Sequence, residues 1–182
     1  MAIRTSKERA MTIQGGVAVG DATTVADKLA ILELLGHYSF TYDAGDLESW
    51  FNLWTDDGSF EVYIPSRSEP ILGASGRNEL IEVITTARED GGFPDELCGF
   101  HLQSVTVFDE LTPIGARIRT MVHATVQTCR DDGTGELDGN TWFERVDSEL
   151  LFGGIYHSEL AKVENRWFFR RRVFMASTTL YP

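Results

Sequence analysis

Apolar side chains recur at helical spacing in three segments of the first half of the chain. The first helix is expected to begin near Thr24 and to end before Gly45, because Leu and Ile recur every three or four residues between them. Thr24 followed by Asp27 is typical of a helix start, and Gly45 is typical of a helix stop. The same spacing predicts a second, short helix over residues 47–54 and a third over 78–88.

Beyond residue 97 the pattern becomes extended and is rich in Val, Thr, Ile and aromatic residues. A shorter extended run, residues 59–64, lies between the second and third helices, and residues 65–76 are expected to form a loop. Two consecutive glycines, Gly153 and Gly154, predict a bulge or a bend inside a long strand. The long strands are predicted over residues 100–108, 116–129, 142–162 and 166–177.

Helices come first in this order and antiparallel strands follow, which is typical of an α+β fold. We expect a cone-shaped α+β barrel, in which the N-terminal helices pack inside a strongly curved, mostly antiparallel sheet with one open mouth. The folded domain is expected to span residues 23–182. Residues 1–22 mix charges with glycines and are expected to form a flexible N-terminal tail.

The composition restricts the partners of this domain. The chain of 182 residues carries 28 acidic against 16 basic side chains, a net charge of −12, which argues against binding to nucleic acid or to an anionic membrane surface. No apolar run is long enough to span a membrane, and no secretory signal is recognisable, so we expect a cytoplasmic protein. Cys98 and Cys129 lack the spacing of a zinc site or of a disulfide framework.

The common catalytic motifs HExxH, GxSxG, Walker A and GxGxxG do not occur, so no metal and no cofactor is expected. Polar residues on otherwise apolar elements remain as candidates for chemistry. Asp43 closes the first predicted helix among aromatic residues, His101 opens a strand, and His123 interrupts the next strand.

Three stretches carry a resemblance to a known family. Residues 30–64 read AILELLGHYSFTYDAGDLESWFNLWTDDGSFEVYI, residues 100–110 read FHLQSVTVFDE, and residues 160–172 read LAKVENRWFFRRR. They are similar to the SnoaL-like branch of the nuclear-transport-factor-2-like superfamily, and the resemblance covers roughly residues 25–178. It implies the cone-shaped α+β fold, but the superfamily hosts many activities.

The resemblance also implies a site. Scytalone dehydratase and bile acid 7α-dehydratase, members of this branch, pair an Asp at the end of the first helix with a His at the start of the strand that follows the third helix. Asp43 and His101 occupy these places. Tyr38 matches an active-site tyrosine five residues before that Asp, and His123 matches a second histidine on the next strand. The resemblance thus implies Asp43, His101, Tyr38 and His123 as catalytic residues.

A carboxylate that accepts a hydrogen bond from one imidazole nitrogen makes the other nitrogen a better base. Such a pair could remove a proton next to a carbonyl and return it to a departing hydroxyl. Val62 stands where ketosteroid isomerase would have its catalytic Asp, which argues against that chemistry. Val62, Trp54 and Trp142 are expected to contact the substrate. In the run Arg170-Arg171-Arg172, strand alternation places Arg170 and Arg172 together, and we expect a solvated outer face there.

The favoured hypothesis is a small cofactor-independent lyase of the dehydratase type, acting on an apolar cyclic or polyketide-like substrate and forming a homodimer or homotrimer. Two alternatives stay open. One is a polyketide cyclase or isomerase on the same fold, because these reactions begin with the same proton abstraction. The other is the non-catalytic small subunit of a Rieske-type aromatic-ring dioxygenase, whose fold and opening motif are similar.

Overall fold

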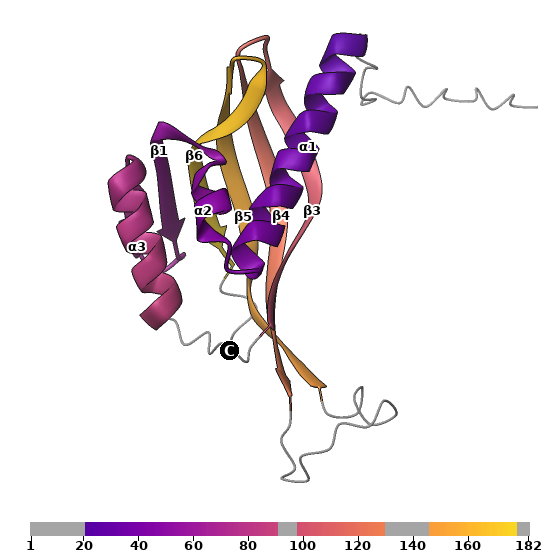
Figure 1. Cartoon of the computed structure of the whole chain (residues 1–182). Coiled ribbons are helices and arrows are strands. Elements are labelled where there is room, and N and C mark those ends of the chain that lie inside the picture. Colours follow the sequence, from indigo (N-terminus) through magenta and orange to yellow (C-terminus); the bar gives the residue numbers. More distant parts are fainter. Residues whose placement is uncertain (1–20, 91–97, 130–145, 178–182) are drawn as a thin grey trace, which may run out of the picture.

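The computed structural model describes residues 21–90, 98–129 and 146–177. Trp142 and residues 1–20 of the tail predicted over 1–22 lie outside this part of the chain, whereas Ala22 already belongs to the first helix. None of the described helices is long and apolar enough to cross a membrane. The elements in chain order are α1 (Ala22–Asp43), α2 (Leu47–Phe51), β1 (Trp54–Tyr63), β2 (Leu72–Ser75), α3 (Arg77–Asp90), β3 (Cys98–Leu111), β4 (Gly115–Cys129), β5 (Val146–Val163) and β6 (Arg166–Ala176) (Figure 1).

The six described strands form one sheet in the order β2-β1-β6-β5-β4-β3. All neighbours are antiparallel except β1 and β6, which run parallel. The helices lie on one side of this sheet: α1 packs along β3 and β6, and α3 packs on β1 and β2 (Figure 1). The predicted α+β cone is confirmed, with a sheet that stays open between the edge strands β2 and β3.

The local pattern misplaced three boundaries. The helix cap is Asp21, whose Oδ1 accepts a hydrogen bond of 2.7 Å from the backbone N–H of Thr24. The second helix ends at Phe51, and Trp54 already belongs to β1, because its backbone pairs with Phe169 of β6. The segment expected to be a loop contains the edge strand β2. Long-range strand pairing sets the last two features, and local spacing cannot show it.

Aromatic rings fill the space between α1, α2 and the sheet. The ring centroid of Trp50 lies 5.2 Å from that of Tyr38 and 5.1 Å from that of Trp54, and Trp54 lies 5.3 Å from Phe169. All four side chains are buried. Burial of such large apolar surfaces is the main stabilising term in a domain of this size, so this cluster fixes α1 and α2 against β1 and β6.

One extra residue in β6 changes which arginines face inward. The pairing passes from Leu160 opposite Phe169 to Glu159 opposite Arg171, which leaves Arg170 as a bulge. Arg170 and Arg171 are therefore both exposed, whereas Arg172 is completely buried. The prediction that Arg170 and Arg172 share a solvated face is wrong, because the bulge reverses the alternation between them.

The double glycine of β5 lies beside another irregularity of the sheet. Ala124 of β4 pairs with Phe152 and Thr125 pairs with Leu150, so the pairing with β4 skips Leu151, two residues before Gly153. A methyl group on Gly154 would overlap the backbone carbonyl oxygen of Met175 in the neighbouring strand β6. The glycine thus permits a close backbone approach at the rim of the cone.

Replacement of Gly154 by Ala should lower the free energy of unfolding by about 1–3 kcal/mol, because overpacking forces the two strands apart. Gly36 in α1 is a matched control, since a methyl group there meets no atom within 4 Å. Gly36→Ala should instead raise stability by about 0.5–1 kcal/mol through helix propensity. Urea unfolding of both variants tests this, and a Gly154→Ala protein as stable as the wild type would contradict it.

A buried carboxylate ties α1 to the β5–β6 hairpin. Asp27 Oδ1 lies 2.6 Å from Lys162 Nζ and accepts a hydrogen bond of 3.1 Å from Trp167 Nε1. The hydrogen bond from Lys162 is the largest cause that lowers the pKa of Asp27 below its ordinary value. The ionised form is therefore favoured in the folded protein.

Asp27→Asn should lower the melting temperature at neutral pH. The wild-type advantage is present above the unfolded-state pKa of Asp, about 3.9, and is lost as the pH falls through the lower pKa of the folded state. The two melting curves should therefore converge in strong acid. An advantage that persists below pH about 2 would show that the charge of Asp27 is not its source.

Candidate active site

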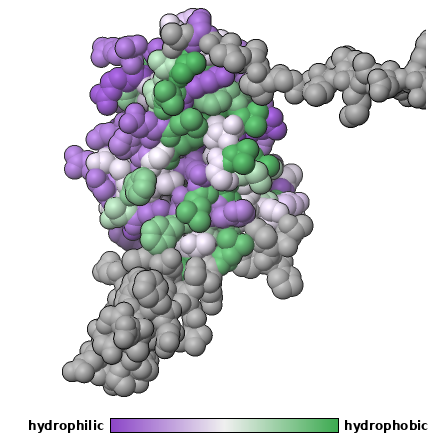
Figure 2. Space-filling model, turned by 90° about the vertical axis from the view of Figure 1, so that its right-hand side faces the viewer, coloured by the Kyte–Doolittle hydropathy of each residue, from purple (hydrophilic) through white to green (hydrophobic). Residues whose placement is uncertain are grey.

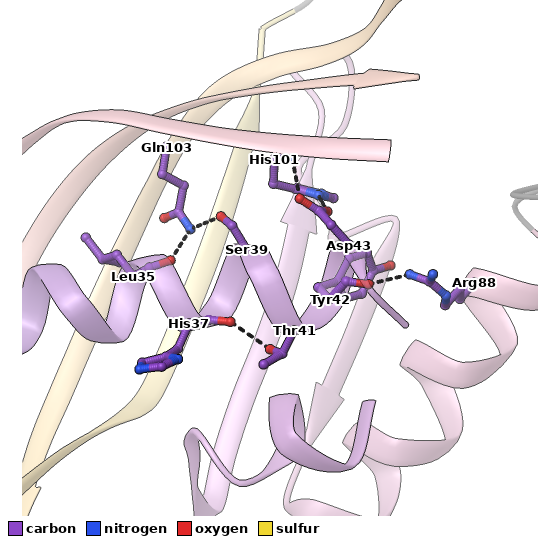
Figure 3. A network of polar contacts seen from close by, with 9 residues as sticks. All are labelled: Leu35, His37, Ser39, Thr41, Tyr42, Asp43, Arg88, His101 and Gln103. Atoms are coloured by element: carbon purple, nitrogen blue, oxygen red, sulfur yellow. Dashed lines mark hydrogen bonds and ion pairs between the residues drawn. The ribbon is translucent and has the colours of Figure 1, made fainter. Parts of the chain in front are cut away.

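Asp43 and His101 form a hydrogen-bonded pair where the end of α1 meets the start of β3 (Figure 3). Asp43 Oδ1 lies 2.5 Å from His101 Nδ1, and Asp43 Oδ2 accepts a hydrogen bond of 2.8 Å from the backbone N–H of His101. The side chains are only 14% and 9% exposed. Because both carboxylate oxygens bind the same residue, the imidazole has one orientation, with Nε2 as its remaining nitrogen.

The end of α1 is held in place by α3. Arg88 Nη1 donates a hydrogen bond of 2.6 Å to the carbonyl oxygen of Tyr42, and its guanidinium lies 5.3 Å from the centre of the Tyr42 ring (Figure 3). Gly45 then turns the chain with a φ of 74°, a conformation that favours glycine. Arg88 and Gly45 together fix the turn from which Asp43 projects.

A second polar link joins α1 to β3 two residues beyond His101. Gln103 Nε2 donates hydrogen bonds to the carbonyl oxygen of Leu35, at 3.0 Å, and to the hydroxyl of Ser39, at 2.8 Å (Figure 3). Because β3 is an edge strand, it has a neighbouring strand on one side only. These side-chain bonds supply the missing anchor and hold His101 at the level of Asp43.

His101 lines a cavity of about 420 Å³ inside the cone. The walls of the cavity are mostly apolar. The His101 ring packs edge-on against Tyr42, at 5.1 Å between centroids, and tilted against Phe152, at 5.6 Å. Three tyrosines also line the cavity, and burial raises the pKa of each above its ordinary value, so their hydroxyls stay protonated. The residues that line the cavity include Tyr38, Tyr42, Val62, His101, Phe152 and Tyr156.

A separate groove of about 950 Å³ lies outside, between α1 and β3. Asp43 lines this outer groove and His101 lines both spaces, so the pair forms part of the wall between them. The face that carries the groove has a stripe of apolar side chains (Figure 2). Its most exposed large members on the two elements are Leu29, Phe40, Leu102 and Val105.

The structure brings Tyr38 and Val62 to the inner cavity with His101. It does not bring His123 there: this side chain is exposed on β4, and its buried neighbours Val122 and Ala124 occupy the inward face. Trp54 is a core residue rather than a cavity residue, because it packs beneath Tyr38. Strand parity and ring packing therefore correct two of the expected site positions.

The largest feature missed from the sequence is Arg172. Its guanidinium lies 3.8 Å from the ring centre of Tyr156, 4.1 Å from that of Tyr38 and 4.6 Å from that of Phe169. Nη2 donates a hydrogen bond to the side-chain oxygen of Gln103. Regular alternation places Arg172 outside, so only knowledge of the bulge could have found it. Within the described residues, no group of three or more metal-ligating side chains is present.

The cone-like fold and the pair at its cavity define a domain of the nuclear-transport-factor-2-like class. The model of the SnoaL-like domain matches residues 23–173, so the chain belongs to the SnoaL-like family. No curated protein matches the sequence.

Solved structures from bacteria share the fold. A candidate scytalone dehydratase from Novosphingobium aromaticivorans is 22% identical, with a TM-score of 0.62 over 85% of this chain and 87% of that one. The beta subunit of a candidate aromatic-ring-hydroxylating dioxygenase from the same organism is 15% identical, with a TM-score of 0.63 over 86% and 92%. ActVI-ORFA from Streptomyces coelicolor is 19% identical, with a TM-score of 0.58 over 84% and 98%.

The geometry predicts one tautomer for His101 in the free protein. In the neutral imidazole, Nδ1 should carry the proton and donate a hydrogen bond to Asp43, and Nε2 should carry none. Long-range ¹H–¹⁵N NMR distinguishes the two nitrogens. Asp43→Asn should shift the His101 tautomer ratio and leave the exposed His123 unchanged, whereas an Nε2-protonated wild type would contradict the pairing.

Proposed function

We propose that this protein is a cofactor-independent lyase of the dehydratase type, with His101 as the base and Asp43 as its partner. One observation supports this most directly. Asp43 binds Nδ1 of His101, so Nε2 is the remaining imidazole nitrogen of a residue that lines a mostly apolar cavity. A base in such a place can take a proton from a carbon acid without competition from water.

The chemistry needs two proton transfers. His101 Nε2 takes the proton from a carbon next to a carbonyl, and the electron pair of the broken C–H bond moves to the carbonyl oxygen to give an enolate. Asp43 stabilises the imidazolium, and the Tyr38 hydroxyl donates a hydrogen bond to the oxygen. The enolate then forms the C=C bond as the β C–O bond breaks, and the imidazolium gives its proton to the departing hydroxyl, which leaves as water.

The cavity favours an apolar cyclic or polyketide-like substrate. A volume of about 420 Å³ suits a ligand of two or three fused rings, and aromatic walls suit a flat one. Val62 contributes to the wall of the cavity, and we propose Trp142 as a further contact of the substrate. The apolar stripe along the outer groove supports a homodimer or homotrimer (Figure 2).

Two other functions fit the same fold. A cyclase or isomerase would use the same first proton transfer by the Asp43–His101 pair. A non-catalytic subunit is the second alternative, since the chain is also similar in fold to a dioxygenase beta subunit. In that function the Asp43–His101 bond would only join α1 to β3.

The exchange of the α-protons of 2-tetralone in D₂O, followed by NMR, tests the proton transfer with a ring system suited to the cavity. The wild type should accelerate the exchange, and His101→Ala should reduce this acceleration by about 10²–10⁴-fold because the positioned base is lost. His123→Ala is the matched control and should keep full activity, since that side chain lies on the outer face.

Full exchange activity in His101→Ala would contradict the proposal. A wild type that does not accelerate the exchange, but purifies only together with a larger subunit, would favour the non-catalytic alternative. Circular dichroism of the variants separates a lost base from a lost fold.

A further inference from the structure

Arg172 is a buried charge without a counter-charge among the described residues. Arg172 is 0% exposed, and none of the ion pairs between described residues includes it. Among the described residues, Nη2 is the only one of its three nitrogens with a hydrogen-bond partner, the side-chain oxygen of Gln103, and Nε and Nη1 have none. A buried guanidinium with one bonded nitrogen out of three is costly and stays charged, so its position in an aromatic core favours an electrostatic role.

The surroundings of this guanidinium connect it to the inner cavity. Tyr38 of α1 and Tyr156 of β5 stack on it, and both tyrosines line the cavity in which His101 lies. The two hydroxyls interact with each other. The positive charge is therefore separated from a ligand in the cavity by one layer of phenol rings, in a place that water does not screen.

The other charged groups around the cavity do not supply the missing anion. Asp43 is the carboxylate that acts on Tyr156, and it is already bonded twice to His101. Arg88 lies over Tyr42 and adds a second cation near the same space. Burial raises the pKa of Tyr38 and Tyr156, so neither ring is the counter-ion, although the charge of Arg172 opposes this rise.

We infer that Arg172 is a positioning residue which, through Tyr38 and Tyr156, makes the inner cavity selective for ligands that carry or develop a negative charge on oxygen, namely phenolates and enolisable carbonyl compounds. This inference rests on the proposed function in one respect, because it takes the inner cavity as the substrate site. One of the two hydroxyls donates to the ligand oxygen and the other donates to that hydroxyl, and the guanidinium behind the rings favours the anionic form of the ligand. An enolate formed when His101 takes a proton would be the counter-charge that the described residues do not give Arg172.

A purely structural role makes a different prediction. If Arg172 only joins the rings by cation–π contacts, its loss changes stability and leaves the ligand's charge irrelevant to binding. An electrostatic role makes affinity depend on whether the ligand oxygen is ionised. The preference for anion over neutral ligand is therefore the decisive measurement.

Binding of 4-nitrophenol tests this preference without any turnover, because the phenol and the phenolate absorb at different wavelengths. Absorbance titrations across the pKa of the free phenol should show that the wild type binds the phenolate at least about tenfold more tightly than the phenol, as expected for an opposite charge nearby. Arg172→Met should abolish the preference for the phenolate, because it removes the charge and keeps most of the side-chain volume. Arg170→Met removes the same charge from the exposed outer face and should retain the preference.

Two further variants keep the test decisive. His101→Ala should still prefer the phenolate, which shows that the imidazolium is not the cause and separates this inference from the proposed proton transfer. Tyr156→Phe, which keeps Arg172 buried, should weaken the preference and serves if Arg172→Met does not fold. A phenolate preference retained in Arg172→Met, retained in full in Tyr156→Phe, or absent from the wild type would overturn the inference.

Discussion

The packing of Tyr38 against four buried rings is the contact on which the rest of the molecule depends. Its ring lies within 6.3 Å of Trp50, Trp54, Tyr156 and Phe169, centre to centre, and so joins α1 to α2, β1, β5 and β6. The same ring stacks on a buried guanidinium and borders the cavity. Tyr38 therefore contributes both to the stability of the core and to the polarity of the candidate site, so a substitution of this residue would change both.

The Asp43–His101 pair joins the helix α1 to the edge strand β3. β3 is an edge strand, and it is joined to α1 by side-chain bonds from Asp43 and from Gln103 rather than by a further strand. Gln103 contacts α1 through its nitrogen and Arg172 through its oxygen. A continuous polar chain thus runs from the helix, through the edge strand, to the guanidinium behind the cavity.

Apart from the edge strand β2, the order of elements could be read from the sequence, because helical spacing and β-rich runs are local patterns. The α+β class follows from that order, and the family resemblance indicated the pairing of Asp43 with His101. The remaining features depend on contacts between distant residues. Trp54 enters β1 because it pairs with Phe169, and His123 faces outward because the β4 register places Val122 and Ala124 inside. No local pattern reports either register, nor the bulge that buries Arg172.

The bulge at Arg170 also bears on how this strand can change in length during evolution. In a regular strand, the loss of one residue turns every later side chain to the opposite face. The bulge already adds one residue to β6. A chain with two arginines in the run, instead of three, would lose only the bulge and would still have its second arginine inside. The loss of one residue is therefore tolerable at the bulge. Elsewhere in β6 it would turn the charged outer side chains toward the cavity and the inner side chains toward solvent.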